Sequence, residues 1–190
     1  MIVAVRTIGE AREYVRVQLA DCADLEIVLG TGYLDPQNRD VTVYLSRCRP
    51  DSEQRIWEFL VADSATDGYG PGTSEAIDGG QWLMLYSGQE QQLAAWADQM
   101  FSPALRPVAE GEDYLRLLGH AEGSLTELRK LLVERRGAAG SVWTEQGRAV
   151  LAQQPAAFDP AWIDARIGEL RTVTERLVAR YRDAERRGLI

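Results

Sequence analysis

The sequence is poor in the residues that most enzyme sites depend on. Among its 190 residues there is one lysine, Lys130, one histidine, His120, and two cysteines. A P-loop needs Gly-Lys-Ser/Thr, which is missing, and a Ser-His-Asp or Cys-His arrangement could be built only around His120. Two cysteines and one histidine also lack the ligand spacing of a zinc site. We therefore predict no metal and no cofactor, assign no catalytic residue, and favour a protein that is not an enzyme.

Long apolar runs are missing as well. No segment approaches the roughly 20 apolar residues of a membrane span, and the start MIVAVRTIGEAREY has neither a basic region nor a long apolar core. We expect no membrane partner, no signal peptide and a cytoplasmic location. Cys22 and Cys48 are too few for a disulfide framework, so we predict reduced, partly buried thiols.

Negative charge is concentrated in the first half of the chain. Residues 1–108 hold 16 Asp and Glu against 8 Arg, and residues 109–190 hold 13 acidic against 13 basic residues. The net charge of −8 therefore belongs to the first half. Nucleic-acid binding needs a basic face that displaces counterions. We expect no nucleic acid as partner and consider a protein with a basic surface instead.

The hydrophobic pattern of the first half predicts an α+β domain. The predicted strands span 2–7, 25–29, 41–47 and 81–87, and the predicted helices span 9–20 and 51–63. The run QWLMLYS at 81–87 is apolar on both sides, as expected for a strand with both faces of its sheet covered. The resulting βαββαβ order is typical of a ferredoxin-like sandwich.

The second half is predicted to be helical. Apolar residues at helical spacing cover 110–136, 144–153 and 160–187, and Asp159-Pro160 is a strong helix start. The final helix would be about 42 Å long at 1.5 Å per residue, so we expect it to pair within a helical hairpin or three-helix unit. The predicted division is a ferredoxin-like domain at 1–107, including a helix over 88–101, and a C-terminal helical region at 108–190 packed on it.

Two local features are candidate functional sites. The glycine-rich loop at 67–80 could hold an anion on its amides, but its three carboxylates would repel phosphate. We interpret this loop as a connector that, if functional, suits a cationic or protein ligand. Carboxylate pairs such as Glu10 and Glu13 are too common on an acidic surface to be assigned as an acid and a base.

Our leading hypothesis is a non-catalytic, acidic protein-interaction module, of the inhibitor or toxin-immunity type. Its charge would speed association with a basic partner. The candidate partner-binding residues are Asp67, Tyr69, Glu75 and Asp78 of the glycine-rich loop, together with Trp57, because tryptophan is enriched at interface hot spots.

Two alternatives stay open. One is a small-molecule-binding protein or cofactor-independent enzyme, with a pocket between sheet and helices lined by Tyr44, Trp82, Tyr86 and His120. It requires a cavity of about 300 Å³ or more on the second face of the sheet. The other is self-association as a homodimer through the final helix.

Overall fold

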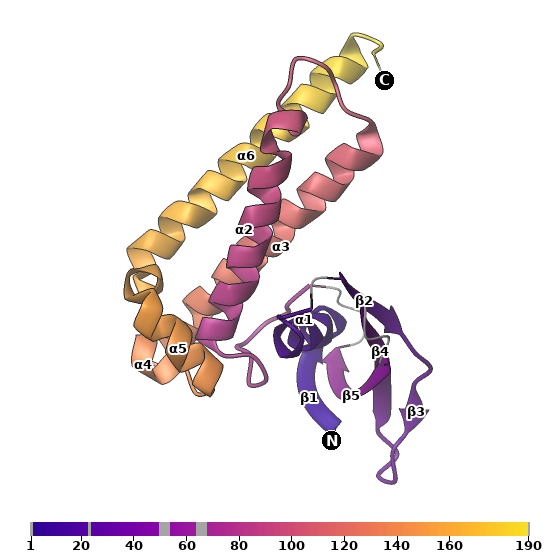
Figure 1. The fold of residues 1–190 in the computed structure, drawn as a ribbon, viewed down its shortest axis with the longest axis vertical. Coiled ribbons are helices and arrows are strands. Elements are labelled where there is room, and N and C mark those ends of the chain that lie inside the picture. Colours follow the sequence, from indigo (N-terminus) through magenta and orange to yellow (C-terminus); the bar gives the residue numbers. More distant parts are fainter. Residues whose placement is uncertain (1, 23, 50–53, 64–67, 190) are drawn as a thin grey trace.

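The protein has a mixed α+β architecture in two parts (Figure 1). The computed structural model describes residues 2–22, 24–49, 54–63 and 68–189. A mixed sheet and helix α1 (Ile8–Gln18) form the first part, which we call the α/β unit. The helices that follow form the second part, the helical bundle, which lies on the α1 side and extends away from the sheet (Figure 1). The predicted α+β class and the helical C-terminal region are thus confirmed.

The sheet is mixed: one pair of neighbouring strands is parallel, and the other pairs are antiparallel. Its strands are β1 (Ile2–Thr7), β2 (Asp24–Leu29), β3 (Tyr33–Leu34), β4 (Asp40–Arg49) and β5 (Gln54–Asp63), in the order β1-β5-β4-β2 with β3 paired to β4. β1 and β5 are parallel, and β4 is antiparallel to its neighbours. Helix α1 covers one face, where Ala11 and Val15 pack on Val5, Tyr44 and Phe59.

The predicted βαββαβ order is wrong, first because strand β5 replaces the helix predicted over 51–63. Residues 51–53 of that helix lie outside the described residues. The segment QRIWEFLVAD has apolar residues at helical spacing, but it also alternates like a strand. Trp57, Phe59 and Val61 pack toward α1, so Ile56 lies on the opposite face. The segment pairs with both β1 and β4, and this pairing favours the strand period of two residues over the helical period of 3.6.

The order is wrong, second, because residues 81–87 lie within helix α2 (Gly79–Met100) instead of forming a strand. The helix begins at the capping box of Asp78 and Gln81, not after Ser87. Trp82, Leu83 and Tyr86 are all buried because neighbouring segments surround this end of α2. A helix that is buried all round is apolar all round, and a short run of this kind resembles a buried strand.

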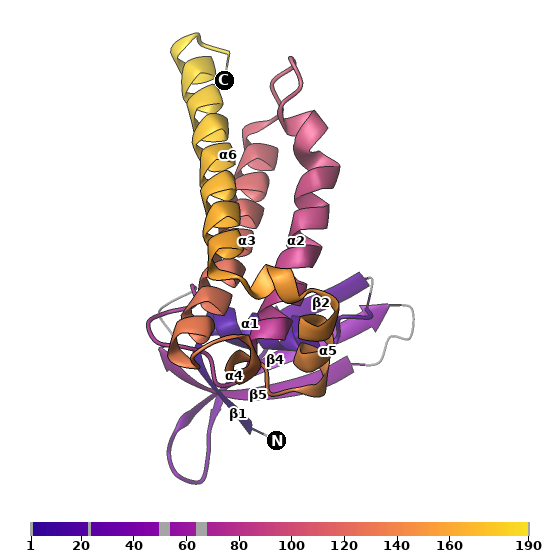
Figure 2. The same ribbon diagram turned by 90° about the vertical axis from the view of Figure 1, so that its left-hand side faces the viewer.

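Three long helices run side by side in the bundle: α2, α3 (Val108–Glu134) and α6 (Pro160–Arg186) (Figure 2). Helix α3 packs on both α2 and α6. The short elements α4 (Ala138–Ser141), α5 (Glu145–Gln153) and the 3-10 helix η1 (Pro155–Phe158) connect α3 to α6. The core contains Trp82, Leu118, Leu125, Leu128, Ile163 and Leu177. None of the described helices has both the length and the apolar content needed to cross a membrane.

A buried ionic network joins the α/β unit to the bundle. Arg6 donates from Nη2 to Glu127 Oε2 on α3 at 2.8 Å and from Nε to Glu10 Oε2 on α1 at 3.1 Å. Lys130 Nζ donates to Glu127 Oε1 at 2.6 Å and to the Gly70 carbonyl oxygen at 3.0 Å. Both carboxylates are buried, and their pairing offsets the cost of removing them from water. The network holds α1 against α3 and ties down the loop at 68–72.

The second face of the sheet is left largely open by the helical bundle. The bundle approaches from the α1 side (Figure 1). On the opposite face, Ile56 is 67% exposed, and Ile2 and Val28 are exposed as well. The later helices of this chain therefore do not cover the second sheet face, and of the two covers that an apolar sheet would call for, these helices or a partner subunit, only the partner subunit stays open as a prediction.

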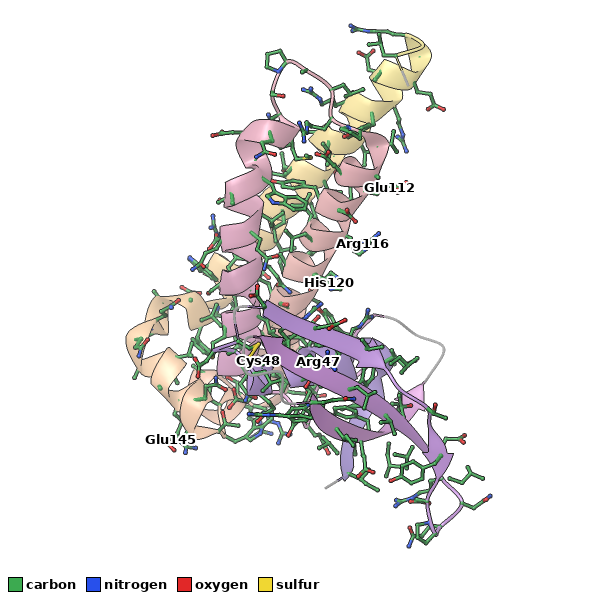
Figure 3. The ribbon with its side chains drawn as sticks, turned by 45° about the vertical axis from the view of Figure 1, so that its right-hand side comes forward. Arg47, Cys48, Glu112, Arg116, His120 and Glu145 are labelled. Atoms are coloured by element: carbon green, nitrogen blue, oxygen red, sulfur yellow. A yellow bond between two sulfur atoms is a disulfide. The ribbon has the colours of Figure 1, made fainter. Side chains whose placement is uncertain are left out.

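Cys22 and Cys48 form a disulfide rather than reduced thiols, with their Cα atoms 5.7 Å apart (Figure 3). The bond links the turn after α1 to strand β4. The antiparallel register of β2 and β4 places Leu25 opposite Cys48, which brings the nearby Cys22 within reach. Sequence spacing alone does not reveal this pairing, because it depends on how the strands align.

Asp78 joins the starts of two helices. Its Oδ1 accepts from the Gln81 amide at 3.0 Å in α2. Its Oδ2 accepts from the amides of Trp143 and Thr144, at 3.0 and 2.8 Å, and from Thr144 Oγ1 at 2.7 Å, just before α5. Asp78 is fully buried, so all of these donors depend on one carboxylate.

We predict that Asp78→Ala lowers the free energy of unfolding by about 3 kcal/mol or more, because each unsatisfied buried donor costs about 1–3 kcal/mol. The matched control is Asp159→Ala, which removes the exposed N-cap of α6. It should cost only about 1 kcal/mol. Chemical denaturation of both variants checks this, and equal losses would contradict the joining role of Asp78.

Candidate functional site

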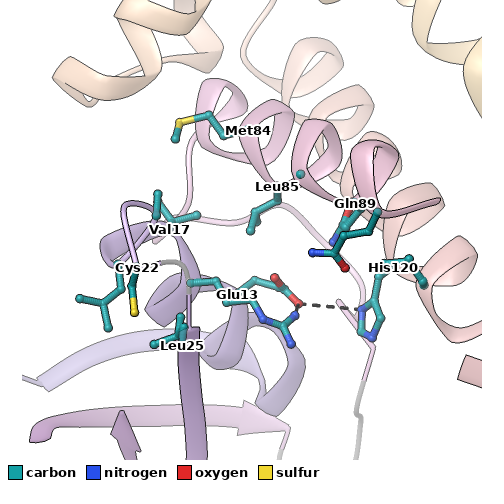
Figure 4. A pocket seen from close by; sticks show the side chains of 14 residues that line it. Glu13, Val17, Cys22, Leu25, Met84, Leu85, Gln89 and His120 are labelled. Carbon is teal, nitrogen blue, oxygen red and sulfur yellow. Dashed lines mark hydrogen bonds and ion pairs between the residues drawn. The ribbon is translucent and has the colours of Figure 1, made fainter. Parts of the chain in front are cut away.

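A cleft lies where α1 of the α/β unit meets α2 and α3 of the bundle (Figure 4). Its cavity has a volume of about 450 Å³. Apolar side chains form much of its wall, namely Val17, Leu19, Leu25, Met84, Leu85 and Leu117. Polar side chains lie at one side, namely Glu13, Arg16, Gln89, Gln92 and His120. The cleft thus combines an apolar wall with a polar side of similar extent, and small-molecule sites also combine apolar and polar lining.

Glu13 is the chemically unusual residue of this cleft. Its side chain is only 1% exposed. Arg16 Nη1 donates to Glu13 Oε1 at 2.5 Å, whereas Oε2 is buried without a hydrogen-bond partner. Burial raises the pKa of the Glu13 carboxyl group, and the charges of Arg16 and Arg12 oppose that rise only in part. A buried acceptor left unsatisfied is costly, so this oxygen is suited to accept a hydrogen bond from a bound molecule.

His120 faces Glu13 across the cleft (Figure 4). Its Nδ1 lies 3.9 Å from Glu13 Oε1 and 3.5 Å from the hydroxyl of Tyr69. Burial, together with the nearby charge of Glu13, raises the pKa of Tyr69. Gly123 makes room for the Tyr69 ring, because a Cβ there would lie 2.3 Å from Tyr69 Cε2. The polar side chains of Glu13, His120 and Tyr69 therefore come from α1, α3 and the glycine-rich loop, respectively.

The cleft continues outward past His120 into a second cavity of about 470 Å³. Both cavities are lined by Arg16, Gln92, Leu117 and His120. On its outer side the second cavity adds Trp96, Asp113 and Arg116. Arg116 and His120 lie one turn apart on the same side of α3 (Figure 3). The site is thus a groove made of two adjoining cavities, with the buried carboxylate of Glu13 in the inner one.

The four residues of the predicted pocket are not brought together. Only His120 lines the cleft. Tyr44 packs on Phe59 in the core between sheet and α1. Trp82 is buried against Tyr69, and Tyr86 in the bundle donates its hydroxyl hydrogen to Glu90 Oε1 at 2.8 Å.

The residues considered for partner binding are also dispersed. Asp67 lies outside the described residues, and Tyr69 packs at the cleft beside His120. Glu75 is exposed, whereas Asp78 is buried and engaged at the helix starts. Trp57 is half-buried on the sheet, where its indole N–H donates to Ser46 Oγ at 2.7 Å. The four of these residues that the structure describes do not form one continuous surface.

Sequence reasoning set Glu13 aside and did not consider Arg16 or Gln89 as site residues. Glu10, Glu13 and Val17 recur at three and four positions, so they share a face of α1. This spacing could have suggested that the carboxylates face a partner element instead of water. Within the described part of the chain, no group of three or more His, Cys, Asp or Glu side chains is placed to hold a metal ion.

The raised pKa of Glu13 predicts a pH-dependent stability. Because the folded protein holds this proton more tightly than the unfolded chain, wild-type stability falls as pH rises above the ordinary carboxyl value of 4.5. Glu13→Gln removes this dependence. We expect the variant to gain stability relative to the wild type as pH rises from about 4.5 to the raised pKa of folded Glu13, by about 1.4 kcal/mol per unit of raised pKa. Denaturation at several pH values checks this; a constant difference would contradict it.

Comparisons of this chain with protein-family models, with curated proteins and with solved structures returned no match. Its function is therefore inferred from the geometry of its own residues.

Proposed function

We propose that the protein binds a small, uncharged organic molecule in the cleft between α1 and the helical bundle. The observation that carries this proposal is Glu13, which lines a cavity of about 450 Å³ and whose buried Oε2 atom has no hydrogen-bond partner. This volume falls within the range of roughly 300–1,000 Å³ that small-molecule sites occupy. On the open second face of the sheet, by comparison, the cavity beside Val28 and Leu45 holds about 220 Å³.

The chemistry of the cleft favours a neutral ligand. Glu13 is already paired with Arg16, so an added ammonium or carboxylate group would upset a balanced pair in a partly buried site. A hydroxyl, amide or heterocyclic N–H group would donate to Glu13 without adding charge. The amides of Gln89 and Gln92 offer both donors and acceptors beside it. The apolar body of such a ligand would lie against Met84 and Leu85.

Binding is a better account of this geometry than catalysis. His120 Nδ1 lies 3.9 Å from the Glu13 carboxylate, which is beyond hydrogen-bond distance. The Tyr69 hydroxyl is at the outer limit, 3.5 Å from the same nitrogen. Proton transfer between these groups would require them to move closer. Glu13 Oε2 already lacks a partner, and a ligand donor reaches this buried oxygen once the side chains over it shift.

Filling the cleft tests this proposal. Gly88 lines the cavity, and a Cβ at this position would meet no atom within 4 Å. We therefore expect Gly88→Phe to fold normally and to occupy the ligand's space. Gln91→Phe, at an exposed position of the same helix that does not line the cavity, is the matched control.

The experiment compares matched sets of compounds: uncharged amides, alcohols and N–H heterocycles on one side, and the corresponding amines and carboxylates on the other. Ligand-observed NMR should detect uncharged donors with the wild type and Gln91→Phe, and lose them with Gly88→Phe. Glu13→Gln should weaken binding by about tenfold or more, since a hydrogen bond to a charged group contributes about 1.5–3 kcal/mol. Equal binding to wild type and Gly88→Phe would place the ligand elsewhere.

A second candidate function is the binding of a protein with a basic surface by the α/β unit. The observation that favours it is the open sheet face, where Ile2, Val28 and Ile56 are exposed beside Glu26 and Glu58. Arg47 lies opposite Glu26 on this face, so the border of the apolar centre carries two carboxylates and one guanidinium among these three residues. This border suits a partner with an apolar patch and a mainly basic rim. This candidate function is the protein-interaction role that the charge of −8 suggests. Its binding surface is the open sheet face instead of the glycine-rich loop.

Ile56→Arg should abolish such binding, because it places a cation at the exposed centre of the face. The control is Val133→Arg, at an equally exposed apolar position on α3. A fitting partner captured by the wild type should also be captured by Val133→Arg and not by Ile56→Arg. Its association rate should fall steeply as salt is raised. A rate unaffected by salt would rule out the charge-driven interaction.

We also propose an oxidising compartment as the working location, in place of the expected cytoplasm. The support is the Cys22–Cys48 disulfide, since such bonds persist mainly where the surroundings are oxidising.

A further inference from the structure

Helices α3 and α6 together present a grooved face to which α2 contributes no lining residue. A cavity of about 840 Å³ lies at its sheet end and one of about 430 Å³ at its far end. On α3 their lining residues are Val108, Gly111, Glu112, Leu115, Thr126, Arg129, Lys130, Val133 and Glu134. This spacing of three and four places nearly all of them on one stripe. We call the surface formed by this stripe and the adjoining stripe of α6 the α3–α6 face.

Exposed apolar side chains mark both ends of this face. Val133 is 65% exposed at the sheet end of α3, and Val108 is 45% exposed at its far end. On α6, Ile167 lines the first cavity and Val178 the second. Apolar side chains aligned along two neighbouring helices are typical of a helix-packing surface.

We propose that the α3–α6 face binds a second copy of this chain, with each helix antiparallel to its counterpart across a two-fold axis. The axis would cross α3 between residues 120 and 121. It would then place Val133 opposite Val108 of the second copy, and Thr126 opposite its Leu115. Each pair involves residues that line opposite ends of the same groove, as a self-complementary interface requires.

The same axis fits α6. The ion pair between Glu122 and Arg171 shows that these positions are level on the two helices. An axis between 120 and 121 on α3 therefore crosses α6 near 172 and 173. It places Ile167, which is mostly buried at the floor of the groove, opposite Val178 of the second copy. It places Asp164 within one residue of the position opposite Arg182 of the second copy, which brings opposite charges together.

The charge distribution favours the antiparallel arrangement. At the sheet end the groove carries Arg129, Lys130 and Arg171 against Glu134 and Asp164, whereas at the far end it carries Glu112 and Glu185 against Arg182. Antiparallel packing joins a slightly positive end to a slightly negative one. It also keeps apart the two acidic halves, each with a net charge of −8, which a parallel dimer would bring side by side.

The face is also large enough for a stable dimer. From Val108 to Val133 the helix rises by about 38 Å at 1.5 Å per residue, and two helices packed 8–10 Å apart present a width of roughly 20 Å. The product is about 750 Å² per copy, close to the roughly 800 Å² per partner of a standard protein interface.

Sedimentation velocity of the full chain tests the proposal. The wild type should sediment at about twice its mass of 21.2 kDa at tens of micromolar. Val133→Asp should be monomeric, with unchanged circular dichroism because the side chain is exposed. Ile56→Asp, on the open sheet face, should stay dimeric. A monomeric wild type at several hundred micromolar, or a dimer lost in Ile56→Asp and kept in Val133→Asp, would overturn it.

A charge exchange tests the antiparallel register. Asp164→Arg and Arg182→Asp should each weaken the dimer by about tenfold, because each places like charges opposite one another. The double variant should restore the dimer. The two positions lie 18 residues apart, or about 27 Å along α6, so they cannot compensate within one copy. No recovery in the double variant would exclude this register.

Discussion

The buried contacts of Arg6 with Glu10 and Glu127 are the interaction on which the rest of the structure depends. They join β1, α1 and α3, and through Lys130 they include the loop at 68–72. Buried ion pairs contribute little net stability, since desolvation offsets most of their attraction, but losing one partner leaves an uncompensated charge. The network therefore acts mainly on geometry: it allows one orientation of the α/β unit on the bundle.

That orientation explains why a cleft exists at all. At the start of α1, Glu10 is held against Arg6, and the backbone amide of Arg6 donates to it at 2.6 Å. One turn later, Glu13 reaches only Arg16 and the edge of His120, because α2 and α3 do not close over the rest of α1. Two similar carboxylates on one helix thus differ in their contacts: Glu10 is hydrogen-bonded inside the protein, and Glu13 keeps one buried oxygen without a partner, which is the oxygen that the proposed ligand would use.

The sequence allowed the class of fold to be predicted, along with the first strands, α1 and the C-terminal helices, because their apolar periods are unambiguous. The misassigned segments, 54–63 and 81–87, are those whose apolar residues fit both periods, so that only tertiary pairing decides. His120 was among the predicted pocket residues because it is the only histidine. The spacing of Glu10, Glu13 and Val17 indicates a shared face of α1, but that this face meets α3 and leaves one oxygen of Glu13 without a partner depends on tertiary packing. The Cys22–Cys48 bond likewise depends on strand register.

The loop at 68–73 lies between the cleft and the α3–α6 face. Tyr69 contacts His120 in the cleft, Lys130 holds the Gly70 carbonyl, and Gly72 and Thr73 line the sheet end of the groove. A second copy seated there would touch the segment that carries Tyr69 to the cleft. The loop therefore links the two proposed sites physically, and Lys130 and Arg6 hold it in place through the Gly70 and Gly72 carbonyl oxygens. Its path depends on glycine, because Gly70 and Gly72 adopt positive φ angles of 68° and 75° that other residues rarely take.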